Sequence, residues 1–237
     1  MAGKRLAGPA KSQQPKAALP VAPRSMAARP VLLVLAGVNG AGKSSIGGNV
    51  MLRRAGLPWF NPDTYTRLLV QGGLALAQAN ALAWHHGVDL LDQAVAAGHS
   101  HAFETTLGGA TMTQRIAAAS STHDVLMWFC GLASPEQHIS RVAMRVAAGG
   151  HAIPDAKIRE RWVQAPLHLI ELLPYLSELR VFDNSADAAT DQAVEDPRPV
   201  LHLLSGTVQF PLALADLEQT PAWAKPIIKA ARDLGRR

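Results

Sequence analysis

The chain has 237 residues, 48% of them hydrophobic, and a net charge of +5 at neutral pH. No apolar run reaches the ~18 to 20 residues that a membrane-spanning helix needs, and no signal-peptide-like apolar segment precedes Pro30, so membrane and secreted classes are excluded. The one cysteine, Cys130, permits no internal disulfide, and we expect a cytoplasmic protein with one domain and extensions.

The positive charge is concentrated at the N-terminus. Residues 1–29 contain six basic side chains and no acidic one, and the remaining 17 basic and 18 acidic residues sum to −1. Because this stretch is rich in Ala, Pro, Lys and Gln and lacks apolar periodicity, we expect a disordered basic leader over 1–29 and a single domain over 30–237. The near-neutral balance of that domain argues against nucleic acid as a partner.

The first predicted element is a strand over Val31–Ala36. A continuous apolar run closed by glycine is typical of a strand that is buried on both faces, as in a parallel sheet. A glycine-rich turn follows, and then a helix is expected from Lys43 to Ala55. The segment Leu57–Phe60 predicts a short second strand, which ends at the sequence Asn61-Pro62-Asp63.

The middle of the chain alternates between the two patterns. We expect helical stretches over 64–98, a strand over 102–106, a helix over 111–120, a strand over 124–131 and a helix over 135–148. A glycine-containing loop over 149–157 leads into a further helix, which Pro166 and Pro174 should break or kink.

The remaining elements are a fifth strand over 179–182, a hairpin over 200–210 and a C-terminal helix from Pro221. Strands that alternate with helices predict an α/β fold. We therefore expect a mainly parallel, five-stranded central sheet, followed by the C-terminal hairpin and helix.

A phosphate-binding loop is the strongest motif. The spacing Gly37-x-x-x-x-Gly42-Lys43-Ser44 matches the P-loop at every fixed position, between an apolar strand and a predicted helix. Glycines let backbone N–H groups converge on phosphate oxygens, the lysine reaches the β- and γ-phosphates, and the serine ligates Mg²⁺. We expect a three-layer P-loop NTPase or kinase-like fold that binds ATP or GTP with Mg²⁺. The expected nucleotide-binding residues are Gly37, Asn39, Gly40, Ala41, Gly42, Lys43, Ser44 and Ser45.

Two acidic residues are candidates for the chemistry. Asp63 ends the second strand beside the expected phosphate site, where it can accept the proton of an attacking hydroxyl or simply cap the next helix. Glu104, followed by Thr105 and Thr106, is an acid within an otherwise apolar strand. It can hold Mg²⁺ through water, orient a substrate hydroxyl, or be an ordinary strand-end residue.

Phosphoryl transfer also needs positive charge beyond Lys43, because negative charge spreads over the transferred oxygens. A mobile lid over about 141–162 can supply it while excluding water. Its four arginines have two alternative fates, in the site or on solvated helix faces, and spacing does not choose among Arg141, Arg145, Arg159 and Arg161. Asn184, after the fifth strand, lies where a P-loop protein holds the nucleotide base.

Together these segments resemble the zeta-toxin family of bacterial P-loop kinases, in particular its short stand-alone members, which are also described as predicted ABC-type ATPases. The resemblance covers about residues 30–185. The matching pieces are GVNGAGKSS (37–45), NPD (61–63), FETTL (103–107), RVAMR with GGHAIP and RERW (141–162), and FDNS (182–185).

The resemblance implies a kinase that phosphorylates a sugar hydroxyl of UDP-N-acetylglucosamine or a related nucleotide sugar, with a protein antitoxin as partner. Asp63 matches the family's general base. Glu104 and Thr106 match the strand that positions the sugar, with Glu104 also a candidate for the metal. Arg145 and Arg161 match the two charge-stabilising arginines of the lid.

One departure and one alternative remain. Larger members carry an arginine where this chain has Gly108, and they are longer on the substrate side, which leaves the identity of the acceptor open. The alternative is an ABC-type or other P-loop ATPase without a small-molecule acceptor. Against it, the chain contains no LSGGQ-like segment and no apolar strand that ends in Asp-Glu.

Overall fold

The fold is described by a computed structural model for residues 28–43, 56–57, 59–186 and 196–235. Several predictions therefore lie outside the described residues: the leader up to residue 27, the helix expected from Lys43 to Ala55 beyond its first residue, and the roles of Ser44 and Ser45.

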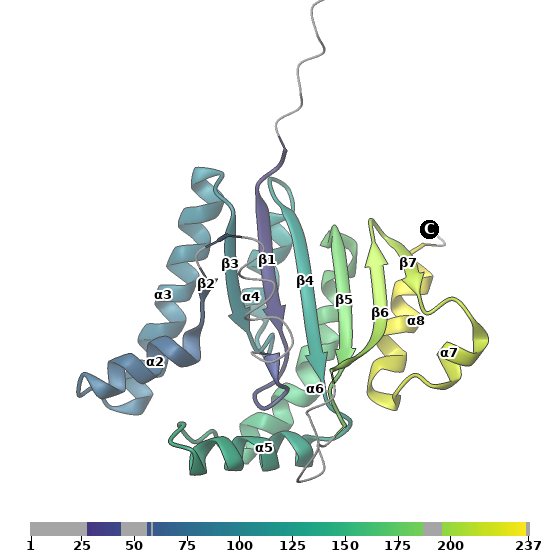
Figure 1. The fold of residues 1–237 in the computed structure, drawn as a ribbon. Helices are drawn as coiled ribbons and strands as arrows, with labels where there is room; N and C mark the ends of the chain where they lie inside the picture. The colour runs from purple at the N-terminus through teal and green to yellow at the C-terminus, as the bar shows by residue number, and fades with distance from the viewer. Residues whose placement is uncertain (1–27, 44–55, 58, 187–195, 236–237) are drawn as a thin grey trace, which may run out of the picture.

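The centre of the molecule is a seven-stranded sheet with the order β2-β3-β1-β4-β5-β6-β7 (Figure 1). The first five strands are parallel, which confirms the predicted five-stranded parallel sheet, and the C-terminal hairpin extends the same sheet with two antiparallel strands. The strands are β1 (Val31–Ala36), β2 (Trp59–Phe60), β3 (His101–Thr105), β4 (Asp124–Gly131), β5 (Glu178–Asp183), β6 (Arg198–Leu204) and β7 (Thr207–Phe210).

The helices follow the predicted pattern with two differences. They are α2 (Pro62–Gln71), α3 (Leu76–Ala97), α4 (Ala110–Ala119), α5 (Pro135–Ala147), α6 (Asp155–Leu172), α7 (Leu214–Glu218) and α8 (Lys225–Leu234). The helical stretches expected over 64–98 are α2 and α3, which are separated because Gly73 adopts a φ of 96°, a value that no helix accommodates. The short helix α7 was not predicted.

The second difference is in α6, where Pro166, expected to break or kink the helix, does not break it. The helix runs on to Leu172, and the following 3₁₀ turn contains Pro174, which does mark its end. Ala165 and Leu169 on either side of Pro166 are fully buried, and α6 packs against α4, α5 and α8. Burial of this face outweighs the hydrogen bond that proline removes.

Strand β1 lies at the centre of the core. Leu32 and Leu35 point to opposite faces of the sheet, and both are at most 1% exposed. One helical layer, formed by α4, α6 and α8, lies behind the sheet in Figure 1. The α/β class and the P-loop kinase-like architecture are thus confirmed.

The carboxyl ends of β1 to β5 meet at one edge of the sheet, and α5 lies across that edge in Figure 1. Open α/β sheets bind ligands at this edge. Among the helices that the structure describes, none is long and apolar enough to cross a membrane.

Candidate active site

The phosphate loop follows β1 and rests on backbone from β4 and α5. Gly37, Gly40 and Gly42 have φ angles of 140°, 83° and 82°, a region that other residues rarely adopt. A Cβ atom at Gly40 would also lie 2.7 Å from the carbonyl oxygen of His138. Both the conformation and the close packing of this loop therefore require glycine.

Donors beneath the loop hold its carbonyl groups. The Cys130 thiol and the Asn184 amide each donate to the carbonyl of Ala41 at 2.9 Å. His138 Nδ1 lies 2.8 Å from the carbonyl oxygen of Asn39, and since a carbonyl only accepts, this nitrogen carries the proton. Burial raises the pKa of Cys130 to about 12 and lowers the pKa of His138 to about 4, so both groups are neutral at physiological pH.

Lys43 lies where the motif requires it. Its Nζ donates to the carbonyl of Gly37 at 2.7 Å, and its side chain lines two adjoining cavities. By contrast Asn184, predicted to hold the nucleotide base, lines neither of them. Its amide instead packs against Gly42 and supports the loop.

The first cavity, here called the phosphate cavity, has a volume of about 390 Å³ and lies beside the loop. Its charged lining comes from the loop, β3, α2 and α5: Lys43, Asp63, Arg67, Glu104, Arg141 and Arg145. Sequence reasoning missed Arg67. The signal was its position four residues after Asp63, on the same face of α2.

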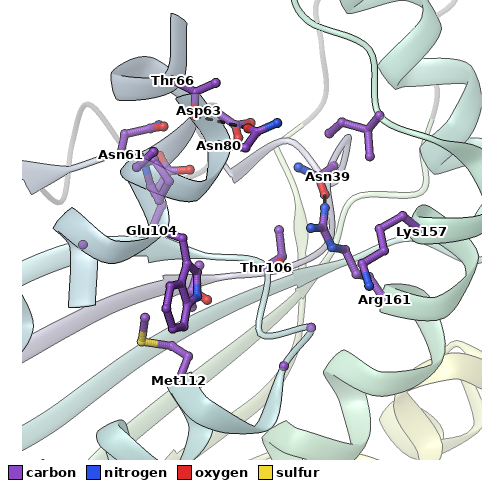
Figure 2. Close-up of a pocket in the computed structure, with 18 of the residues that line it drawn as sticks. Asn39, Asn61, Asp63, Thr66, Asn80, Glu104, Thr106, Met112, Lys157 and Arg161 are labelled. Atoms are coloured by element: carbon purple, nitrogen blue, oxygen red, sulfur yellow. Dashed lines mark hydrogen bonds between the residues drawn. The ribbon is translucent and has the colours of Figure 1, made fainter. Parts of the chain in front are cut away.

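The second cavity, here called the acceptor cavity, has a volume of about 440 Å³. Its apolar lining comes from β2, β3, α3, α4 and the loop before α6: Phe60, Trp84, Phe103, Met112 and Ile153. Polar groups include Asp63, Glu104, Thr106 and Arg161, which Figure 2 shows around the cavity.

Five residues line both cavities and form the boundary between them: Lys43, Asn61, Asp63, Glu104 and His151. Asp63 accepts a hydrogen bond from Arg145 Nη1 at 3.1 Å, and His151 Nε2 lies 3.8 Å from its other oxygen. Capping of α2 belongs to Asn61, whose side chain accepts from the backbone N–H of Thr64. The carboxylate of Asp63 is therefore not needed as the helix cap.

Glu104 is 8% exposed, and no other carboxylate among the described residues is buried. Burial raises its pKa, and the opposing effects come first from the charge of Lys43 and then from hydrogen bonds with Trp59 and Asn61. A carboxylate in this position suits a nucleotide-bound Mg²⁺, which takes most of its ligands from phosphates and water. Within the described part of the chain, no group of three or more His, Cys, Asp or Glu side chains forms an all-protein metal site.

The four candidate arginines separate clearly. Arg141 and Arg145 line the phosphate cavity and Arg161 lines the acceptor cavity. Arg161 donates to Asn39 Oδ1 at 2.6 Å, and burial lowers its pKa. Arg159 instead pairs with the exposed Glu136 at 2.5 Å, on the surface of the molecule. The structure thus brings three of the four to the site.

A glycine loop after β1, a basic cavity beside it and a second cavity at the same sheet edge define the P-loop kinase class of fold. No protein-family model and no curated protein sequence matches the chain. Solved structures do: the AvrRxo1-ORF1:-ORF2 complex with ATP matches with a TM-score of 0.58 and 18% identity over 83% of this chain.

The native AvrRxo1-ORF1:-ORF2 complex matches with a TM-score of 0.59 and 17% identity, over 87% of this chain and 71% of that chain. This protein spans only 65% of the chain that it matches in the ATP complex. A slighter likeness, with a TM-score of 0.49 and 12% identity over 88% of each chain, is to the PezAT chromosomal toxin–antitoxin system of Streptococcus pneumoniae. At 17 to 18% identity, the likeness to the AvrRxo1 complexes shows the fold, which is the one that the sequence motifs predicted.

Proposed function

We propose that the protein is an ATP-dependent kinase of the zeta-toxin type, which transfers the γ-phosphoryl group to a hydroxyl of a small molecule. One observation carries the proposal: the Asp63 carboxylate lies on the boundary between the phosphate cavity and the acceptor cavity, together with Lys43. A hydroxyl in the acceptor cavity can therefore meet a base and a terminal phosphate at one place.

The nucleotide belongs in the phosphate cavity. Lys43 would leave the Gly37 carbonyl for the β- and γ-phosphates, while the loop supplies backbone N–H groups. ATP is the favoured nucleotide because the AvrRxo1 complex of the same fold was solved with it. Mg²⁺, held through Glu104 and Ser44, would neutralise charge between the phosphates.

Transfer forms a bond between the acceptor oxygen and the γ-phosphorus and breaks the bond from that phosphorus to the β–γ bridging oxygen, releasing ADP. Asp63 takes the hydroxyl proton, and the arginines offset charge on the transferred oxygens. Arg145, which donates to Asp63 at 3.1 Å, would exchange this partner for a phosphoryl oxygen and so free the base.

The acceptor proposed is a nucleotide sugar, UDP-N-acetylglucosamine or a related metabolite. Support comes from the matched motifs and from the cavity itself, which combines aromatic walls with Glu104, Thr106 and the cation Arg161. The proposed partner is a protein antitoxin, in line with the zeta-toxin resemblance. The structural relatives named AvrRxo1 were likewise solved as complexes of two proteins.

The test is an assay with γ-labelled ATP and a panel of UDP-sugars, nucleosides and simple alcohols. Label on a small molecule, absent with Lys43→Ala, is the expected result. Labelled free phosphate alone would favour the alternative, a P-loop ATPase. If ATP binds and neither product forms, the kinase assignment is wrong.

A further inference from the structure

Asn39, in the phosphate loop, does not point its side chain at the phosphate cavity. Its Oδ1 accepts a hydrogen bond from Arg161 Nη1 at 2.6 Å, the contact drawn as a dashed line in Figure 2. An arginine is only a donor, so the amide oxygen rather than the amide nitrogen must face it. Asn39 itself is 4% exposed, which leaves this side chain little freedom to turn elsewhere.

The backbone of Asn39 is fixed as well. Its carbonyl oxygen accepts from His138 on α5, while its side chain binds Arg161 on α6. Asn39 of the phosphate loop thus contacts both α5 and α6. These two helices flank the segment 148–154, whose residues His151 and Ile153 line the acceptor cavity. The position of α6 over the site is therefore coupled to the conformation of the phosphate loop.

Gly108, which follows β3, provides the space for Arg161. A Cβ atom at position 108 would lie 2.7 Å from Cγ of Arg161, in the middle of its aliphatic chain. The φ of Gly108 is not in the left-handed region, so its backbone would tolerate alanine and the constraint is steric. The side chain of Arg161 would have to adopt another rotamer to avoid the added methyl group.

The neutrality of Asn39 matters for the charge of the site. A carboxylate at this position would neutralise the guanidinium, whereas an amide orients it and leaves its full positive charge available to phosphoryl oxygens. Asn39, Arg161 and Lys43 all line the acceptor cavity. An oriented cation at this place is worth most during transfer, when negative charge develops.

We propose that Asn39 is a positioning residue that holds Arg161 in place against the phosphate loop, in space left by Gly108. The packing of α6 against the loop and the position of the Arg161 guanidinium then depend on the same hydrogen bond. The catalytic part of this inference rests on the proposed kinase function. The contact itself can be tested without it.

A double-mutant cycle tests the catalytic part. We expect Asn39→Ala to lower kcat by roughly tenfold or more while the Kd for ATP changes by less than about threefold, because the change acts through Arg161. Adding Asn39→Ala to Arg161→Ala should then cause no further loss. Additive losses, or a loss of ATP affinity with an unchanged kcat, would overturn the proposal.

Gly108→Ala gives a second test that leaves the phosphate loop intact. This variant should lower kcat in the wild-type background, because it displaces Arg161. It should have no effect in the Arg161→Ala background, where the near side-chain atom that remains, Thr106 Oγ1 at 3.4 Å, is in ordinary van der Waals contact with the methyl group. Equal losses in both backgrounds would show that Gly108 serves another purpose.

Hydrogen exchange of residues 148–162, measured without an acceptor, separates the contact from the chemistry. We expect faster exchange in Asn39→Ala and wild-type exchange in the matched variant Asn80→Ala, since Asn80 lines the same cavity but bonds to Thr66. Faster exchange with no transfer by the wild type would overturn the kinase function and keep the contact. Unchanged exchange with normal transfer would overturn the contact and keep the function.

Discussion

The two cavities that meet at Asp63 are built in different ways. The phosphate cavity is shaped by one short loop and by arginines on two helices, and it is strongly basic. The acceptor cavity draws its lining from β2, β3, α3, α4 and α6, and much of it is apolar. In the proposed kinase, recognition of phosphate would depend on backbone geometry that neighbouring residues set, whereas recognition of the acceptor would depend on side chains that the whole fold must assemble.

The largest effect should come from Lys43→Ala, because Lys43 lines both cavities and is the lysine of the phosphate loop itself. We expect no detectable transfer of label from γ-labelled ATP, since both nucleotide binding and charge neutralisation are lost. The melting temperature should stay close to that of the wild type, because the side chain is half-buried and bonds only to loop carbonyls in the described structure. Unchanged turnover would refute the assignment.

The second-largest effect should come from removing an arginine, and the variants allow one arginine from each cavity to be compared. Arg145→Ala and Arg161→Ala should each slow transfer by ~10³ to 10⁵, the range for arginines that stabilise a phosphoryl transition state. Arg159→Ala is the matched control, because this side chain pairs with Glu136 on the surface. Single-turnover rates measure the effect. A loss below about tenfold would mean that the arginine concerned does not stabilise the transition state.

The exchange of Asp63 for Asn tests the boundary. We expect transfer to fall by ~10² to 10⁴, the usual contribution of a general base. The Kd for ATP should change little, because the Asp63 carboxylate bonds to Arg145 and lies beside His151, and in the proposed reaction it acts on the acceptor hydroxyl. Isothermal titration with ATP gives this Kd, and a large loss of affinity would mean that Asp63 serves the nucleotide.

The smallest effect concerns the support beneath the phosphate loop. The pKa of His138 is lowered by burial to about 4 from an ordinary value of 6.5, so the unfolded chain binds a proton that the folded chain does not. Stability is therefore present above pH 6.5 and is lost as the pH falls toward 4, by roughly 3 kcal/mol in full.

This loss can be measured by urea unfolding between about pH 7 and pH 5, before most carboxylates titrate. The variant His138→Asn keeps a donor for the Asn39 carbonyl but has no titrating group. Its stability should fall less steeply than that of the wild type over this range. Parallel curves for the two proteins would contradict the assignment of a neutral, buried His138.

Predictions from sequence succeeded where the signal was local. The apolar runs gave β1 and β4 with their observed bounds, and the spacing of the loop glycines matched their positive φ angles. They failed where distant residues decided the outcome. Helix α6 is the example, because it continues through Pro166 where a break or kink was expected. Its packing against other helices buries Ala165 and Leu169 and keeps α6 intact.

The candidate site shows the same division. Lys43, Asp63 and Glu104 could be chosen from sequence, because each lies in or after a predicted strand whose end is at the binding edge. The choice among the four arginines could not be made, because the spacing of residues along a helix does not show whether a given face points into the site or into solvent. Arg67 and His151 were missed as members of the boundary and its cavities.

The sequence by itself determined the α/β class, the parallel character of the sheet and the phosphate loop, because these depend on periodicity and on glycine conformations within a few residues. Only the tertiary structure decided which arginines reach the site, what Asn39 binds and which side chain lies against Gly108. These facts concern residues far apart in the chain that only packing brings together, such as Asn39 and Arg161, whose Oδ1 and Nη1 atoms lie 2.6 Å apart.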